Sequence, residues 1–307
     1  MILAAFLFFL AQNFDLRGTL LPATQASVSL HGSTSPFNSS TLAGPDGRFR
    51  FKKLEPGTYT LIVFVPGRGE LRKTIEVTSA VSSSKGRIEI AVRLDDAKFA
   101  PDRSSVVTMR ELAIPDSARN EFRRAMEKLE SRDVEAAIEH LNRAVELAPQ
   151  FVAAWNHLGT IAYQTRRYTD AETFFRRSLE ADPNAYEPLV NLGGVLVTLG
   201  RFEEAWTCNL HATLQKPTDA LAHSQMGMTY AGLNRPDLAE KYLLEAIRLD
   251  PAHFSHPQLL LAEIYAGRGQ RIKAANALED FLRHHPGYSG ESRLREAISK
   301  LRGSPGT

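Results

Sequence analysis

The stretch that decides the fold, residues 155–183, reads WNHLGTIAYQTRRYTDAETFFRRSLEADP. Similar residues recur at a fixed spacing on both sides of it. The clearest marks are prolines 34 residues apart, with a last interval of 35: Pro149, Pro183, Pro217, Pro251 and Pro286. A period of this length indicates stacked repeats. Each proline ends a helix because it lacks an N–H and restricts the residue before it.

Small residues recur in the same phase as the prolines. They form pairs between the first and the second helix of a unit: Gly159 with Ala171, Gly193 with Ala205, and Gly227 with Ala239. Small residues let two antiparallel helices approach closely, while larger apolar residues fill the space between neighbouring pairs. The pattern therefore predicts five helix pairs stacked into a solenoid.

This pattern, with Trp155, Leu158, Gly159, Tyr168 and Pro183 in its best unit, resembles the tetratricopeptide repeat. We place the repeats within residues 118–286, with these bounds: 118–151, 152–185, 186–219, 220–253 and 255–287. The resemblance implies an all-α solenoid whose first helices line a concave groove that holds protein partners. Residues 288–302 follow helical spacing and are expected to cap the solenoid.

The front of the chain has a different period. In residues 13–94, apolar and polar residues alternate, as at Ile88, Ile90, Val92 and Leu94, and turn signals separate the runs. This predicts a small β-sandwich of about six strands. Asp46-Gly47 is expected to make a hairpin turn. The fold class is thus a two-domain β + α chain, with residues 95–116 as a linker.

One run in this region is more specific. Residues 46–51 read DGRFRF and residues 54–61 read LEPGTYTL, with Phe49, Phe51 and Tyr59 expected to point inward. This closely resembles the carboxypeptidase regulatory-like domain, a prealbumin-like (transthyretin-type) sandwich related to carbohydrate-binding-like folds. In that family the domain accompanies a catalytic or transport partner and is not itself the peptidase. The resemblance leaves glycan binding open as an alternative.

Residues 1–12 form an uncharged apolar run that is too short to cross a bilayer as a helix. The run is typical of the core of a secretory signal, although no Lys or Arg precedes it and no Ala-x-Ala site follows. A true start upstream of Met1 would account for the missing basic segment, and a buried first strand is the alternative. With its repeats, the chain resembles exported bacterial proteins, and we expect it in the periplasm or secreted.

Charge and motifs exclude several functions. The net charge of +2 favours neither nucleic acid nor an anionic membrane, although residues 13–94 carry an excess of five cations. His-Glu-x-x-His, Gly-x-Ser-x-Gly and phosphate-loop motifs do not occur, and the Ser-x-x-Lys match at residues 82–85 lies in a serine-rich turn between expected strands, so we expect no enzyme activity and no cofactor. The single Cys208 cannot form an internal disulfide. His253, His256, His284 and His285 lie near repeat ends and are expected to be solvated and not to bind a metal.

The remaining candidate is the concave groove. The sixth position of each repeat lies on its first helix and is expected to face the groove. In the five repeats this position is occupied by Arg123, His157, Asn191, Gln225 and Leu260. Three hydrogen-bonding side chains in register, His157, Asn191 and Gln225, could pair with the backbone of an extended peptide. Nearby candidates are Asn156, Thr160, Tyr163 and Met228. Only Asn191 matches the clamp with which the family holds a C-terminal carboxylate, so that mode is not expected.

These observations predict a non-enzymatic scaffold of the cell envelope that holds a partner peptide or an extended segment of a protein in the concave groove. The alternatives are a sandwich that binds glycan while the repeats recruit an enzyme, an enzyme of a type without a recognised motif, and a polar column that merely solvates the groove. No transmembrane helix is expected.

Overall fold

The computed structural model describes residues 13–95, 99 and 112–303. The apolar leader of residues 1–12 and most of the 95–116 linker lie outside these ranges. Within them, an N-terminal β-sandwich is followed by a helical solenoid, as the sequence predicts. No helix in the described part of the chain is long and apolar enough to span a bilayer.

The sandwich has two sheets around one apolar core. Its neighbouring strands are antiparallel, apart from one parallel pair. Its strands are β1 (Phe14–Leu21), β2 (Ala26–Gly32), β3 (Asn38–Ala43), β4 (Arg48–Leu54), β5 (Gly57–Val65), β6 (Gly69–Val77) and β7 (Arg87–Arg93). One sheet has the order β4-β1-β7 and the other β3-β2-β5-β6. The parallel pair is β1 with β7. Alternating side chains fill the core, because successive residues of a strand point to opposite faces.

The core confirms the inward positions expected from the DGRFRF and LEPGTYTL runs. Phe49, Phe51 and Tyr59 are 5%, 3% and 1% exposed. The hairpin expected at Asp46-Gly47 is wrong, because the turn joins β3 and β4, which belong to different sheets. Gly47 does have the positive φ of 72° that such a turn requires. Turn chemistry fixes the local reversal but does not say which strand the chain pairs with next.

The solenoid consists of helix pairs that follow one another along the chain. The first helices are α2 (Asp116–Glu130), α4 (Val152–Gln164), α6 (Tyr186–Thr198), α8 (Ala220–Gly232) and α10 (Pro257–Gly267). The second helices are α3 (Val134–Leu147), α5 (Tyr168–Ala181), α7 (Phe202–Gln215), α9 (Pro236–Leu249) and α11 (Arg271–His284). A final helix, α12 (Glu291–Arg302), packs on α11 and ends the stack.

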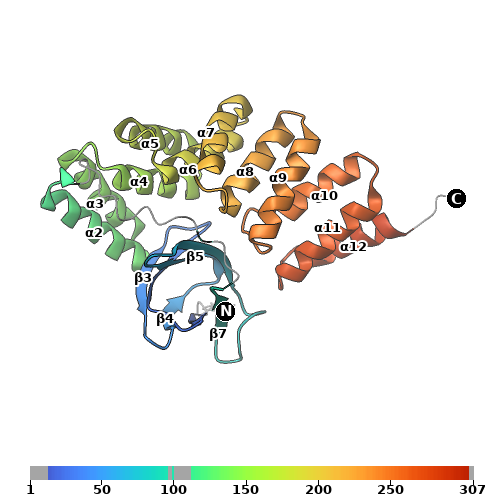
Figure 1. The fold of residues 1–307 in the computed structure, drawn as a ribbon, viewed down its shortest axis with the longest axis horizontal. Coiled ribbons are helices and arrows are strands. Elements are labelled where there is room, and N and C mark those ends of the chain that lie inside the picture. The colour runs from blue at the N-terminus through green and yellow to red at the C-terminus, as the bar shows by residue number, and fades with distance from the viewer. Residues whose placement is uncertain (1–12, 96–98, 100–111, 304–307) are drawn as a thin grey trace, which may run out of the picture.

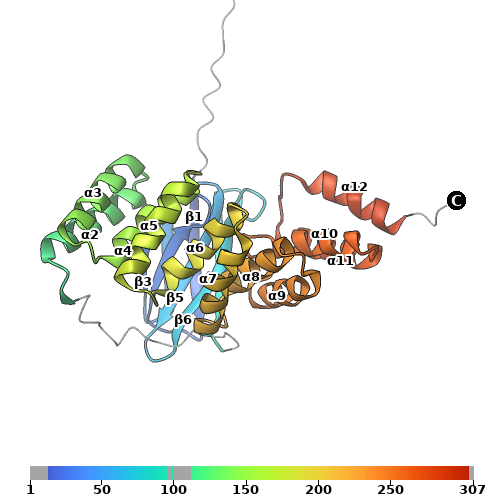
Figure 2. The same ribbon diagram turned by 90° about the horizontal axis from the view of Figure 1, so that it is seen from above.

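The two domains are packed together. Figure 1 shows the solenoid as an arch, with the sandwich beneath it and the β3 and β5 side of the sandwich toward the helices. Seen from above in Figure 2, strands β5 and β6 run beneath α6 and α7. The four-stranded sheet therefore faces the concave side of the solenoid, which is the side expected to hold a partner. The three-stranded sheet faces away from the helices.

Candidate functional site

Polar contacts join the sandwich to successive parts of the solenoid. In the first repeat, Arg132 donates a hydrogen bond of 2.9 Å to the Tyr59 hydroxyl. In the second, the Gln164 amide donates to the Gly32 carbonyl over 2.8 Å. Further along, the Thr74 backbone N–H donates to Asp250 over 2.9 Å. These contacts span most of the length of the arch, so the sandwich is held in a defined position.

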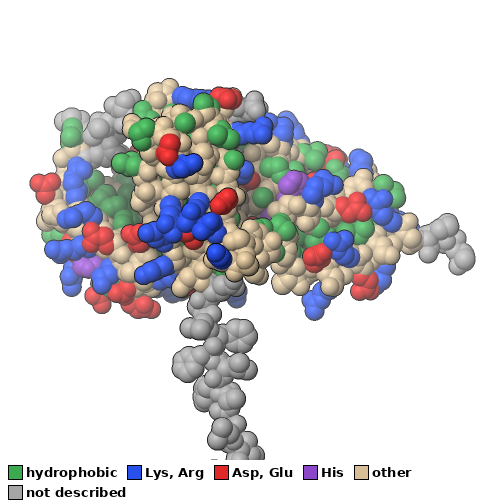
Figure 3. Space-filling view, turned by 90° about the horizontal axis from the view of Figure 1, so that it is seen from below, with side chains coloured by type: hydrophobic (Ala, Val, Ile, Leu, Met, Phe, Trp, Pro, Cys, Tyr) green, Lys and Arg blue, Asp and Glu red, His purple; other side chains and the backbone are tan. Residues whose placement is uncertain are grey.

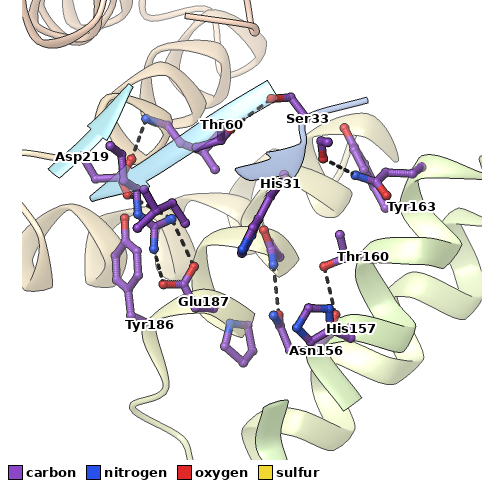
Figure 4. Close-up of a pocket in the computed structure, with 18 of the residues that line it drawn as sticks. His31, Ser33, Thr60, Asn156, His157, Thr160, Tyr163, Tyr186, Glu187 and Asp219 are labelled. Atoms are coloured by element: carbon purple, nitrogen blue, oxygen red, sulfur yellow. Dashed lines mark hydrogen bonds and ion pairs between the residues drawn. The ribbon is translucent and has the colours of Figure 1, made fainter. Parts of the chain in front are cut away.

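A cavity of about 1390 Å³ lies between the outer face of the four-stranded sheet and the first helices of the repeats. Figure 4 shows side chains from the sheet and from the helices facing one another across it. On the molecular surface, Figure 3 shows a hollow with apolar side chains between the sandwich and the helices at the left of the view. The groove of the solenoid is thus one wall of a site whose other wall is the sheet.

All seven groove candidates line this cavity. They are Asn156, His157, Thr160 and Tyr163 on α4, Asn191 on α6, and Gln225 and Met228 on α8. They come together because residues at one position of successive repeats lie on the same face of neighbouring first helices. The sequence did not indicate that a sheet would cover them.

Part of the expected column of hydrogen-bonding side chains is engaged within the chain. The Asn191 amide donates to the Asn156 side-chain oxygen over 3.0 Å. His157 takes no part in this chain of amides and instead packs edge-on against Phe122, with ring centroids 5.3 Å apart. The Asn156–Asn191 pair therefore forms a short amide ladder on the helix wall.

Gln225 lies on the next first helix, α8, and its side-chain acceptor has no partner among the described residues. The residue is 8% exposed, and the unpaired atom is Oε1. Its Nε2 lies only 2.5 Å from the place where a Cβ on Gly194 would be, so glycine at 194 is what lets the amide lie across α6. A buried carbonyl without a partner costs free energy unless a ligand or water supplies a donor. This unpaired acceptor distinguishes Gln225 from Asn156 and Asn191, whose side chains bond each other.

The sheet wall was missed at the sequence level. It includes His31, Thr60, Ile62 and Phe64, which take the outward positions of β2 and β5. Leu61-Ile62-Val63-Phe64-Val65 is an unbroken apolar run, which indicates a strand covered on both faces. That run was the signal in the sequence that the outer face of β5 is not in open solvent.

A charge cluster closes one side of the cavity. Arg72 on β6 donates to both oxygens of Glu187, at 2.5 and 3.3 Å, and also bonds Glu70. Asp219 lies 3.7 Å from the same guanidinium, and Lys216 lies 3.3 Å from Glu187. Burial disfavours the charge of Glu187, but Arg72 and Lys216 outweigh it and lower the pKa of Glu187 to about 2. The cluster holds the sandwich to the start of α6.

The histidines that line the cavity are neutral near pH 7. Burial, with a contribution from His31, lowers the pKa of His157 to about 4. Burial also lowers the pKa of His31, with Arg72 acting in the same direction. A neutral imidazole can both donate and accept a hydrogen bond. Away from the Arg72 cluster, the middle of the cavity therefore offers uncharged hydrogen-bonding groups beside the apolar Ile62, Phe64 and Met228.

The expectation of solvated histidines at the repeat ends is wrong for two of them. His253 and His285 are 5% and 2% exposed. For His285 the reason is the sandwich, because Glu76 of β6 forms a hydrogen bond to it. Among the described residues, no group of three or more His, Cys, Asp or Glu is placed to hold a metal ion.

Comparison with protein families accounts for both parts of the chain. The model of the carboxypeptidase regulatory-like domain matches residues 17–92. Two models of the tetratricopeptide repeat match residues 122–186 and 220–253. The chain carries a carboxypeptidase regulatory-like domain followed by tetratricopeptide repeats. Such repeats support a protein–protein interaction scaffold, and repeats of this kind are in general not catalytic.

Curated relatives match parts of the chain. The human protein O-mannosyl-transferase TMTC3 is 27% identical over 150 residues, which cover 48% of this chain and 16% of that protein. The Hsp70-Hsp90 organising protein of Plasmodium falciparum is 30% identical over 94 residues, covering 31% of this chain and 37% of that protein. The matched part of the chain thus spans well under half the length of either relative.

Solved structures share the fold of the solenoid. The type IV pilus biogenesis factor PilW has a TM-score of 0.56 at 22% identity, covering 62% of this chain and 87% of its own. PilF of Pseudomonas aeruginosa has a TM-score of 0.52 at 20% identity, covering 61% and 85%. At this level of identity the likeness concerns the fold alone.

Proposed function

We propose that the protein is a non-enzymatic scaffold of the cell envelope that holds an extended, uncharged segment of a partner protein in the cavity between the four-stranded sheet and helices α4, α6 and α8. The observation that carries the proposal is the set of amide side chains on the helix wall of the cavity, Asn156, Asn191 and Gln225, of which Gln225 has an Oε1 without a partner among the described residues. The backbone N–H and C=O groups of an extended segment are partners that such amide side chains can bind.

The chemistry of the two walls favours a neutral peptide. Amides and neutral histidines pair with backbone groups at about 0.5–1.5 kcal/mol net per bond, while Ile62, Phe64 and Met228 offer contacts for apolar side chains. A charged side chain would have to leave water for a cavity whose ion pairs are already formed around Arg72. Two walls also bury a segment more completely than an open groove would.

The described sandwich offers less to the carbohydrate alternative. Tyr59 is in the core and is not available as a platform for a sugar ring. The outer face of the four-stranded sheet is turned toward the helices, so a polysaccharide that binds this face would have to enter the same cavity. We therefore take the peptide as the ligand and the glycan as an outcome to be tested.

The test uses the full chain with a photoreactive amino acid in place of Met228, inside the cavity, or of Leu214, which is 72% exposed on α7. Irradiation in envelope extracts should give a discrete protein adduct from position 228 and not from 214. The variant His157→Ala, Asn191→Ala, Gln225→Ala should reduce that adduct at least about tenfold, because roughly three hydrogen bonds are lost. Circular dichroism and X-ray scattering would verify that the helices and the docked sandwich are intact.

Equal adducts from positions 228 and 214, or an adduct that the triple variant leaves unchanged, would refute the cavity as the site. Placement in the envelope rests on the apolar run of residues 1–12 and is tested separately by fractionation of cells that express the chain with a C-terminal tag. Recovery of the uncleaved chain in the cytosol alone would contradict it.

A further inference from the structure

The outer face of the three-stranded sheet is basic. Its outward positions carry six cations, Arg17 on β1, Arg48, Arg50 and Lys52 on β4, and Arg87 and Arg93 on β7. The same face carries two carboxylates, Asp15 and Glu89. Figure 3, which views the sandwich from the side away from the solenoid, shows Lys and Arg side chains gathered across its lower part. This basic face is separate from the cavity, which lies on the other sheet.

The cations differ in how firmly they are held. Asp15 bonds Arg50 through both of its oxygens at 2.6 Å and also bonds Arg17 at 3.2 Å, so these two cations are fixed at the centre. Arg48 has only an exposed contact of 3.6 Å with Asp46 in the adjoining turn. Lys52, Arg87 and Arg93 extend into solvent. Four cations at the margin are therefore available to a partner.

The strand register shows that these four cations are spread both along and across the outer face of the sheet. On one side of β1, Arg48 lies beside Thr19, and Lys52 follows Phe51, which lies beside Leu16. On the other side, Arg87 lies beside Asp15 and Arg93 beside Leu21. Arg48 and Arg93 are thus at one end of the sheet, and Lys52 and Arg87 at the other. The charges therefore lie at the four corners of the outer face of the sheet, with Leu21, 42% exposed, near one edge.

From this layout we propose that the basic face binds the surface of an anionic phospholipid bilayer. Charges spread over a face in two dimensions can approach an extended anionic surface together, whereas a linear polyanion would follow one edge. Each cation near such a surface contributes about 1 kcal/mol, which corresponds to about fivefold in partitioning. With the basic face on a bilayer, the solenoid projects away from the lipid and the cavity stays clear of it.

The experiment measures binding of the full chain to vesicles by sedimentation. One set of vesicles contains phosphatidylcholine alone, and the other contains phosphatidylglycerol as about a third of the lipid. The test variant is Arg48→Gln, Lys52→Gln, Arg87→Gln, Arg93→Gln. The matched control removes four exposed cations from the solenoid instead, Arg143→Gln, Arg235→Gln, Lys241→Gln, Arg293→Gln. Both variants lower the net charge by the same amount, and thermal melting verifies that each is folded.

We expect the unaltered chain to bind the anionic vesicles at low salt and to dissociate as salt is raised, because screening weakens exposed charges. The test variant should bind at least about 100-fold more weakly, and the control should lose less than about fivefold. Equal losses in the two variants would overturn the proposal, since the effect would then come from net charge. Equal binding to neutral vesicles would also overturn it, and so would retention on an acidic polysaccharide without binding to vesicles.

Discussion

Arg72 forms ion pairs that connect the two domains. Its side chain is 22% exposed and lies between Glu70 of its own strand and Glu187 and Asp219 of the solenoid. Two cations, Arg72 and Lys216, thus face three carboxylates. Removing Arg72 would leave these carboxylates partly buried with only Lys216 near them, which is a larger loss than the net value of the pairs.

We predict that Arg72→Met lowers the free energy of unfolding by about 1–2 kcal/mol, because three partly buried carboxylates lose their principal partner. The measurement is urea unfolding followed by circular dichroism. Lys73→Met, at the next position of the strand, is exposed and should change the stability by less than about 0.5 kcal/mol. The double variant Arg72→Met, Glu187→Met should recover part of the loss. An Arg72→Met midpoint equal to that of Lys73→Met would contradict the role of the cluster.

The seven groove candidates could be found from the sequence because each occupies a fixed position in a repeat of known period. Their partners across the cavity could not, since Ile62 and Phe64 belong to a domain with no sequence relation to the repeats. Arg72 is equally hard to find, because an outward arginine on a strand reads as a solvated side chain. Its partners on the solenoid, Glu187 and Asp219, are 115 or more residues away along the chain.

At the scale of helices, the small residues have the role that the sequence predicts, with an added detail. A Cβ on Gly159 would lie 2.5 Å from the Phe175 ring, and one on Gly193 would lie 1.9 Å from Oδ1 of Asn209. In α4, α6 and α8 the glycine therefore accommodates a side chain one helical turn beyond the alanine expected to face it. The period of the sequence predicted which helices approach, but the residue in contact depends on the turn in between.

Substitution of these glycines should be costly only where a neighbour is close. We predict that Gly193→Ala destabilises the chain by about 1–3 kcal/mol, because Asn209 is buried and its side chain has little room to move. Gly267→Ala, at the end of α10, meets nothing within 4 Å and should be neutral or slightly stabilising. Thermal melting of the two variants checks this. A Gly193→Ala chain as stable as Gly267→Ala would contradict the close approach.

At the scale of the whole molecule, the sequence predicted both domains but not their packing. Repeats and strands each produce a regular spacing of residues, which can be recognised within a short stretch of sequence. The contact between them depends on single residues dispersed along the chain, such as Arg132, Gln164 and Asp250, none of which forms a motif. The apolar run of β5 was the one regional sign that a second surface covers the sheet.

Acid should separate the two domains. Burial lowers the pKa of His31, His157, His253 and His256, and it brings the pKa of His157 and His256 to about 4. Exposed histidines take up protons near pH 6.5, so the separated form gains protons first. The stability of the packed form is therefore complete above about pH 6.5 and is lost as the pH falls toward 4, with a slope of up to about 1.4 kcal/mol per pH unit for each histidine.

X-ray scattering between pH 7 and 4 is the measurement, and we expect the radius of gyration to rise while the helical circular dichroism persists. Glu187 stays ionised across this range because its pKa is about 2. The variant His31→Gln, His157→Gln should shift the change to lower pH. A radius that stays constant until the helices themselves melt would argue against this account.

The bond from Thr74 to Asp250 has a consequence for synthesis. Strand β6 ends the four-stranded sheet, and such an edge can pair with strands of other chains. Here Asp250 occupies a backbone N–H of that edge from 176 residues downstream. A growing chain that has completed its sandwich must therefore make almost all of the fourth repeat before this cap exists. Until then, β6 can pair with strands of other nascent chains. The repeats, which are synthesised later, therefore protect the exposed edge of the domain that is synthesised first.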